Sequence, residues 1–226
     1  MHRLFTLIIL SLFLTHCLMA QIEHSEPPKN DANEYMLRNS HEDLARAFDS
    51  SERDQWQKPD EVIAFLGEIE EKTIVDLGSG SGYFTFRLLA AGANVIAADV
   101  DDEFLSIIKD KVQKLGLEDE NLNTLLLDDD RLNVTSRSVD ILFLVNVYHH
   151  ISDRVNYFRQ ANSVLKEDGK IVIVDFYKKK LPVGPPKDHK ISKDLVLDEL
   201  TSAGYEEVAV DEELLDYQYI IVANQY

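Results

Sequence analysis

A short apolar stretch followed by a glycine-rich turn most constrains how this 226-residue chain can fold. Residues 73–75 lead into Asp76, and Gly78, Gly80 and Gly82 then follow at alternate positions, directly before a helical pattern. Glycine has no Cβ, so a turn of this kind between a strand and a helix lets the backbone approach a ligand closely. The pattern therefore predicts a ligand site at the carboxyl end of a buried strand.

The spacing of these glycines distinguishes two classes of ligand. The dinucleotide fingerprint G-x-G-x-x-G needs a glycine three positions after its second glycine, where this chain has Tyr83. Asp76 beside the turn also suits a cationic ammonium group better than a pyrophosphate. The stretch resembles motif I of the class I S-adenosylmethionine-dependent methyltransferases, and the resemblance covers about residues 34–226. An ordinary turn without a ligand is the alternative.

The order of the elements is typical of a sheet covered on both faces, because continuous apolar strands alternate with helices. The end differs, since two strands joined by a short acidic loop can pair antiparallel. The resemblance implies an α/β Rossmann-like methyltransferase fold, with a seven-stranded, mostly parallel sheet, a C-terminal antiparallel strand and helices on both faces. We expect strands at 74–77, 95–98, 122–127, 139–145, 170–176, 206–210 and 217–223, and helices at 60–66, 83–91, 103–115, 154–165 and 193–203.

The N-terminus is organised differently from the rest of the chain. Residues 1–20 contain a basic residue, an apolar run and a small residue, Ala20, in the order of a signal peptide. The run is shorter than the about 20 residues of a membrane span, so we expect export by cleavage, with an uncleaved membrane anchor or lipidation at Cys17 as alternatives. Residues 21–33 are predicted to be a flexible leader, and residues 34–226 a methyltransferase domain.

Charge and cysteine content exclude several classes of function. The chain has 41 acidic and 23 basic residues and a net charge of -18, so we do not expect it to hold nucleic acid. Its single cysteine, Cys17, lies in the N-terminal segment. The cleaved chain would therefore have no thiol nucleophile and no cysteine-ligated zinc. The expected partner is a small-molecule acceptor, with membrane association only through the apolar N-terminus.

Acidic residues follow the next two strands. Asp99 ends the second strand, where a carboxylate can accept both hydroxyl groups of a ribose, and the resemblance supplies the same role. Its alternative role is that of a helix N-cap. Asp128 or Asp129 follows the third strand, where similar methyltransferases bind the adenine amino group. A divalent cation or a plain acidic turn are the alternatives there.

A polar run follows the fourth strand and resembles that of many small-molecule methyltransferases. The resemblance places the Asn146 amide at the methionine end of the cofactor and Tyr148, His149 and His150 near the transferred methyl group. A histidine there could remove the acceptor's proton, because its ordinary pKa lies near neutral. It could equally be a cap or a packing residue. Two adjacent histidines lack the third ligand that a metal needs, so no metal site is predicted.

Two further segments are candidate lids. Tyr35 precedes the core of the domain and could stack over the sulfonium of S-adenosylmethionine, as an aromatic ring does over a cation. The segment 184–190 follows the fifth strand and carries His189, a second candidate base. A surface loop without a role in the site is the alternative.

These features together predict an S-adenosylmethionine-dependent methyltransferase that acts on a small molecule by in-line displacement. The predicted export conflicts with this function, because the cofactor is a cytosolic metabolite. The alternative is an exported, non-catalytic protein that binds a ligand or partner through a methyltransferase-like fold, since a fold does not determine a function.

Overall fold

The computed structural model describes residues 38–117, 120–128 and 131–224. The predicted signal peptide or anchor, the leader at 21–33 and Tyr35 lie outside the described residues. In the part of the chain that is described, no helix is both long enough and apolar enough to cross a membrane.

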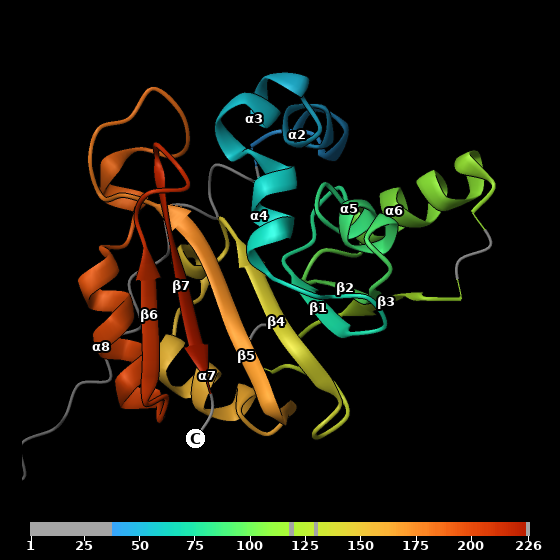
Figure 1. Cartoon of the computed structure of the whole chain (residues 1–226). Coiled ribbons are helices and arrows are strands. Elements are labelled where there is room, and N and C mark those ends of the chain that lie inside the picture. The colour runs from blue at the N-terminus through green and yellow to red at the C-terminus, as the bar shows by residue number, and fades with distance from the viewer. Residues whose placement is uncertain (1–37, 118–119, 129–130, 225–226) are drawn as a thin grey trace, which may run out of the picture.

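A seven-stranded sheet with the order β3-β2-β1-β4-β5-β7-β6 forms the centre of the molecule (Figure 1). All pairs from β3 to β5 are parallel, whereas β7 runs antiparallel to both of its neighbours. The predicted fold class is therefore confirmed, including the single reversed strand at the C-terminus. The strands are β1 (Thr73–Leu77), β2 (Asn94–Asp99), β3 (Leu122–Leu126), β4 (Val139–Val145), β5 (Leu165–Phe176), β6 (Glu207–Asp211) and β7 (Gln218–Asn224).

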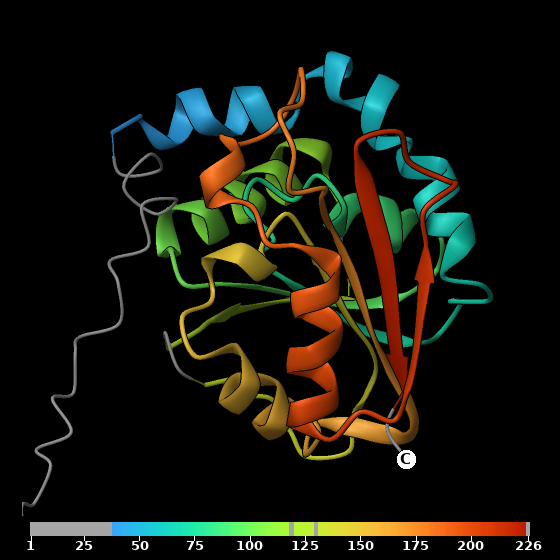
Figure 2. The ribbon, with the colours of Figure 1, turned by 90° about the vertical axis from the view of Figure 1, so that its left-hand side faces the viewer.

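Helices cover both faces of this sheet because its central strands are apolar on both sides. In β4, Leu142 and Leu144 pack in the core under α7 and α8, while Ile141 and Phe143 pack in the core under α4 and α5. Figures 1 and 2 show these two helical layers on either side of the sheet. The helices are α2 (His41–Phe48), α3 (Ser51–Gln57), α4 (Pro59–Phe65), α5 (Thr85–Ala90), α6 (Asp102–Leu115), α7 (Arg154–Ala161) and α8 (Lys193–Ala203), with 3-10 turns η1 (Tyr148–His150) and η2 (Lys187–His189).

The helix expected at 154–165 was predicted too long. It ends at Ala161, and Leu165 instead begins β5, where it pairs with Val139. A register shift follows this pair, after which Ile141 pairs with Lys170. An apolar residue such as Leu165 can be buried by a helix or by a strand, so periodicity could not place the boundary.

The helices α2 and α3 lie at the end of the sheet towards which β4 and β5 point (Figure 1). Ser40 and Ser50 cap them, each accepting a hydrogen bond from a backbone N–H of the first turn. Lys58 then adopts a left-handed conformation (φ 45°), and Pro59 begins α4. The segment between β5 and α8 reaches the same end of the sheet (Figure 2). These helices and this segment therefore cover the carboxyl end of the parallel strands. Ligands bind at that end in open parallel sheets.

Candidate functional site

The glycine loop, residues 78–82, begins where β1 ends. Gly78, Gly80 and Gly82 have φ values of 71°, 51° and 88°, a region that side chains rarely adopt. The N–H groups of Gly78 and Ser79 both donate to the carbonyl oxygen of Ala98 in β2, at 2.7 and 3.1 Å. The loop is thus a fixed backbone turn fastened to the neighbouring strand.

The space beside this loop is too narrow for a side chain at Gly78. A Cβ on Gly78 would lie 2.3 Å from a methyl carbon of Val147, which follows β4. A Cβ on Gly80 would lie 3.4 Å from the ring of Phe48 in α2. The loop therefore touches both the turn after β4 and the helices above it.

Asp99 lies at the end of β2 and is 8% exposed. Its carboxylate accepts hydrogen bonds from the N–H of Gly80 at 2.8 Å and from that of Asp101 at 3.1 Å. Burial raises the pKa of Asp99 above its ordinary value. The N-cap of α6 is Asp101, which accepts a hydrogen bond from the N–H of Glu103. Asp99 therefore holds the glycine loop and is not the cap of the helix.

Asp76 is buried in β1, one residue before the strand ends. Its carboxylate accepts a hydrogen bond from the Thr85 hydroxyl at 2.6 Å. Burial raises the pKa of Asp76 to about 6, and the bond from Thr85 and the charge of Arg53 oppose this shift. A cationic group placed nearby would favour the ionised carboxylate. The ligand role predicted for Asp76 stays a prediction.

The helices α2 and α3 form a cover over the glycine loop. The guanidinium of Arg53 lies 3.9 Å from the centre of the Tyr83 ring, and Arg87 lies 4.0 Å from that centre. Burial lowers the pKa of Arg53 to about 10. The contact between Arg53 and Tyr83 had no local signal in the sequence, because the two residues lie 30 positions apart. Further polar contacts between the cover and the domain are His41 with Asp101 and Glu103, Asp49 with Ser81 and Lys111, and Asp54 with Tyr83 and Arg87.

Three side-chain amides meet at the carboxyl end of β4, of which those of Gln57 and Gln218 are fully buried and that of Asn146 is partly buried. Gln57 of α3 donates to Gln218 of β7 at 2.8 Å, Gln218 donates to Asn146 at 2.5 Å, and Asn146 donates to Gln57 at 3.4 Å. Asn146 adopts a left-handed backbone conformation, with a φ of 62°. Only Asn146 was predicted from the sequence. Its amide is thus part of a closed ring of hydrogen bonds that ties the helical cover to the sheet.

The turn after β4, which we call the β4 turn, comprises residues 146–150 and contains two of the predicted bases. His149 is 5% exposed, and its Nδ1 lies 2.9 and 3.0 Å from the two carboxylate oxygens of Asp175, at the end of β5. The ring of His150 lies 4.3 Å from that of His149. Burial and the neighbouring His149 and His189 lower the pKa of His150 to about 4. The structure therefore brings all three predicted histidines to one place.

Tyr148 lies elsewhere. Its ring is fully buried in the core on the α7 and α8 face, where it stacks on Phe158. Its hydroxyl donates to the carboxylate of Glu199 in α8 at 2.7 Å, and Arg154 binds the same carboxylate. The structure does not bring this side chain to the glycine loop, and these contacts give it a packing role.

The acids after β3 are placed only in part. Asp128 is exposed and accepts a hydrogen bond from the Asn133 amide at 3.1 Å. Asp129 lies outside the described residues. Among the residues that the structure describes, no three His, Cys, Asp or Glu side chains are grouped to hold a metal.

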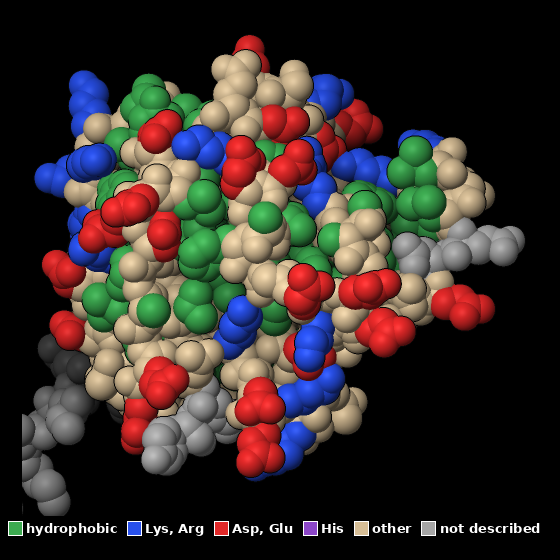
Figure 3. Space-filling view, in the orientation of Figure 1, with side chains coloured by type: hydrophobic (Ala, Val, Ile, Leu, Met, Phe, Trp, Pro, Cys, Tyr) green, Lys and Arg blue, Asp and Glu red, His purple; other side chains and the backbone are tan. Residues whose placement is uncertain are grey.

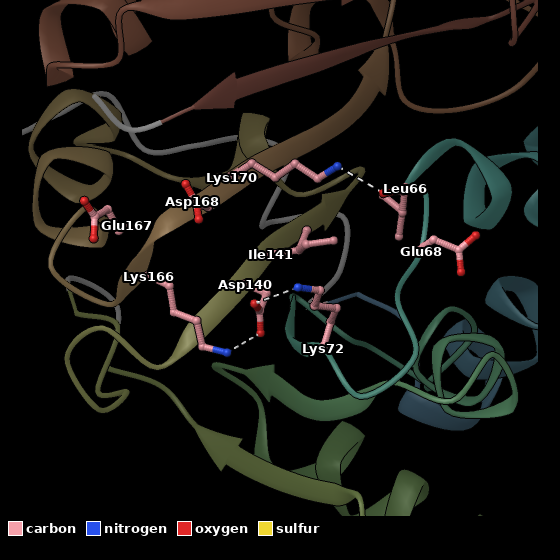
Figure 4. A pocket seen from close by; sticks show the side chains of 9 residues that line it. All are labelled: Leu66, Glu68, Lys72, Asp140, Ile141, Lys166, Glu167, Asp168 and Lys170. Atoms are coloured by element: carbon pink, nitrogen blue, oxygen red, sulfur yellow. Dashed lines mark hydrogen bonds and ion pairs between the residues drawn. The ribbon is translucent and has the colours of Figure 1, made fainter.

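A hollow of about 360 Å³ lies at the opposite, amino end of the sheet (Figure 4). Lys72 and Lys166 lie 3.6 and 2.5 Å from the two oxygens of Asp140, and Lys170 donates to the carbonyl of Leu66. Lys72 and Lys166 are thus paired with an acid of the chain, and Lys170 is hydrogen-bonded to its backbone. On the face shown in Figure 3, basic side chains are mixed with acidic ones.

Comparison with known proteins identifies the class of this fold. Residues 75–173 match the model of a family described as the methyltransferase domain. A SAM-dependent methyltransferase from Aquifex aeolicus is 25% identical, with a TM-score of 0.72 over 80% of this chain and 96% of that one. A further S-adenosylmethionine-dependent methyltransferase, from Mesorhizobium loti, is 20% identical, with a TM-score of 0.59 over 73% and 95% of the two chains.

A more distant fold neighbour was solved with a ligand. It is a phosphoethanolamine N-methyltransferase from Haemonchus contortus in complex with S-adenosyl-L-methionine, 13% identical, with a TM-score of 0.63 over 75% of this chain and 52% of that one. The resemblance to class I S-adenosylmethionine-dependent methyltransferases predicted from the glycine turn is confirmed by these matches.

Proposed function

We propose that this chain, which carries a methyltransferase domain, binds S-adenosylmethionine and transfers its methyl group to a small-molecule acceptor. One observation supports this most strongly. The glycine loop has no room for a Cβ at Gly78, and it lies between Asp76 and Asp99 at the carboxyl ends of the neighbouring strands β1 and β2. Acid, backbone and acid in this order suit a ligand with an ammonium group, a narrow middle and a ribose.

The residues fit that cofactor without rearrangement of the strands. Asp99 would accept the ribose hydroxyls with the lone pairs that Gly80 and Asp101 do not use, since a carboxylate has about four acceptor positions. Asp76 would face the ammonium group, and the Asn146 amide would lie near the same end. The exposed Asp128 would meet the adenine amino group at the edge of the site.

The contribution of the protein to catalysis is to position the reactants and exclude water. S-adenosylmethionine supplies a methyl group on a sulfonium, which is already a good leaving group. The cover formed by α2 and α3 lies over the glycine loop and removes it from solvent, and the hydrogen-bonded amides of Gln57, Gln218 and Asn146 fix the β4 turn beside the loop. Held in this way, an acceptor and a methyl group react as if at a much higher concentration.

A small acceptor fits the surface charge better than a nucleic acid does. With a net charge of -18, the chain repels polyanions, and its lysines around the amino-end hollow are engaged by its own acids and carbonyls.

The proposal is tested with S-adenosylmethionine carrying a labelled methyl group. The protein is incubated with a cell extract divided into low-molecular-weight, protein and nucleic-acid fractions. We expect label to appear in the low-molecular-weight fraction, and S-adenosylhomocysteine to accumulate in step with it. Label only in the protein or nucleic-acid fraction would refute the small-molecule acceptor, and failure to bind the cofactor would refute methyl transfer itself.

A further inference from the structure

We propose that Asp175 and His149 act as a pair in which the carboxylate orients the imidazole to take the proton from a hydroxyl group of the acceptor, so that the enzyme is an O-methyltransferase. This inference rests on the proposed function and specifies its acceptor. Asp175 was not identified from the sequence, and its part would be that of a positioning residue.

The geometry of the pair is that of an oriented base. Both carboxylate oxygens of Asp175 lie within hydrogen-bond distance of Nδ1 of His149, at 2.9 and 3.0 Å. A neutral imidazole that donates its Nδ1 proton to a carboxylate keeps its basic lone pair on Nε2. The carboxylate therefore determines both the tautomer and the direction of the ring, as the third group of a catalytic triad does.

Asp175 is 0% exposed, so its negative charge needs stabilisation within the chain. It receives the backbone N–H of Phe176 at 2.7 Å in addition to the imidazole. Lys190, itself buried, lies close enough for Asp175 to raise its pKa, in opposition to the burial that lowers it. A buried carboxylate supported in this way is suited to fix the histidine ring and stabilise its protonated form.

The pair lies next to the glycine loop. His149 is two residues after Val147, whose methyl group occupies the space where Gly78 would carry a Cβ. The strands β1 and β4 are parallel neighbours. The glycine loop and the β4 turn therefore begin at the same end of the sheet, where these two strands stop. A base on the β4 turn is therefore beside the site proposed for the cofactor, where an acceptor must also lie.

Other titratable groups surround the pair. His150 lies on the same turn, His189 approaches from η2, Lys190 follows η2, and Tyr219 of β7 pairs with Asp175 in the sheet. The pKa of His150 is lowered to about 4, so near neutral pH this ring carries no positive charge beside His149. His149 is the histidine whose ring nitrogen lies within hydrogen-bond distance of the Asp175 carboxylate.

The chemistry follows from what a base is needed for. A carboxylate acceptor is already a nucleophile and an amine attacks through its own lone pair, whereas a hydroxyl must lose its proton to become reactive. The hydroxyl proton passes to Nε2 of His149 as the oxygen forms a bond to the methyl carbon. The carbon–sulfur bond breaks with its electron pair left on the sulfur, and the imidazolium later releases its proton to water.

The first test needs no acceptor. Nitrogen-15 NMR of histidine-labelled protein near pH 7 identifies which nitrogen of His149 carries a proton, with His149→Gln used to assign the signals. We expect a neutral ring protonated on Nδ1, and a change of tautomer in Asp175→Asn but not in the exposed control Asp188→Asn. A ring protonated on Nε2 alone, or a doubly protonated imidazolium forming a structural ion pair, would overturn the proposal.

The second test uses the low-molecular-weight fraction as acceptor and carbon-13 methyl S-adenosylmethionine. We expect an O–CH3 signal, and an N–CH3 or C–CH3 signal would contradict the inference. In Asp175→Asn the rate should fall about a hundredfold with unchanged cofactor affinity. With a phenolic acceptor, the deficit should shrink as the pH rises towards about 10, because a phenol ionises by itself there. With such an acceptor, a deficit that is the same at every pH would make Asp175 merely structural. Loss of cofactor binding in the wild type would instead refute the proposed function.

Discussion

Two neighbouring regions at one end of the sheet are built on different principles. The glycine loop is made of backbone, and two of its N–H groups bind one carbonyl of the adjacent strand. The β4 turn is made by side chains, since Asn146 and His149 are held by Gln57, Gln218 and Asp175 from three other elements. The conformation of the glycine loop requires residues without side chains, whereas the conformation of the β4 turn is held by hydrogen bonds between side chains.

This difference determines how each region can be damaged. Adding a single carbon is enough to disturb a backbone site, because the loop has no space for it. A side-chain site is disturbed by removing one polar partner, because the others are then left buried without a hydrogen bond. The two regions touch at Gly78 and Val147, so each kind of damage can also be tested for its effect on the other.

The largest effect is expected for Asp99→Ala, which removes the acid that we propose binds the ribose. The loss of charged hydrogen bonds to two hydroxyl groups should weaken S-adenosylmethionine binding about a hundredfold. Calorimetric titration measures this, and circular dichroism shows whether the variant is folded. The control is Asp102→Ala, an exposed acid three residues later, which should bind as the wild type does. Equal affinity in the two variants would remove Asp99 from the site.

The next effect is expected for Gly78→Ala. Its Cβ would lie 2.3 Å from Val147, so we expect the free energy of unfolding to fall by about 2 kcal/mol through strain and overpacking. Chemical denaturation gives this value. The matched control is Gly67→Ala, which has a similar positive φ of 85° but nothing within 4 Å of the added carbon.

The coupling between the two regions is sharpened by the double variant Gly78→Ala, Val147→Ala. Removing the valine methyl groups makes room for the added carbon, so part of the lost stability should return relative to the sum of the single changes. Strictly additive losses would show that the loop and the β4 turn are not in contact.

A smaller effect is expected from pH. Burial raises the pKa of Asp76 to about 6, and a ligand with an ammonium group needs the ionised carboxylate. Cofactor affinity should therefore decrease as the pH falls through 6, by about tenfold at pH 5. The stability of the ligand-free protein should respond in the opposite direction, because a raised pKa contributes stability at low pH that is lost as the pH rises through 6. In Asp76→Asn both trends should disappear.

The smallest effect is expected at the cover. His41 binds Asp101 and Glu103, and the hydrogen bond with Asp101 raises the pKa of the histidine. One third of its side chain is exposed, so His41→Ala should lower stability by less than about 1 kcal/mol. The loss should be present below the ordinary pKa of 6.5 and vanish as the pH rises through the raised value. Thermal unfolding at several pH values measures it, with the exposed Arg46→Ala on the same helix as control.

The backbone-made region was the part that the sequence could predict. Glycine spacing, Asp76 before the turn and Asp99 at a strand end are local signals. The mostly parallel sheet followed from the alternation of strands and helices, whereas the order of its strands was not predicted. The structure brings these residues together at the carboxyl ends of β1 and β2. Their roles toward a cofactor stay predictions. The helix boundary at Ala161 was missed, because Leu165 is equally at home in a helix or a strand.

The side-chain-made region could be predicted only in outline. His149 and His150 were visible as a polar run after a buried strand, but Tyr148 in the same run points into the core toward Glu199. Asp175 looked like one more residue of an apolar strand, and Gln57 and Gln218 had no local signal. Their roles depend on pairing between elements as much as 161 residues apart, which no spacing rule describes.

The most direct test of this account is a calorimetric titration of the folded, purified protein with S-adenosylmethionine and S-adenosylhomocysteine. We expect micromolar binding of both ligands, which should be lost or much weakened in a folded Asp99→Ala variant and retained in Asp175→Asn. The absence of binding by a demonstrably folded wild-type protein would contradict the claim that the glycine loop and its two acids form a working cofactor site.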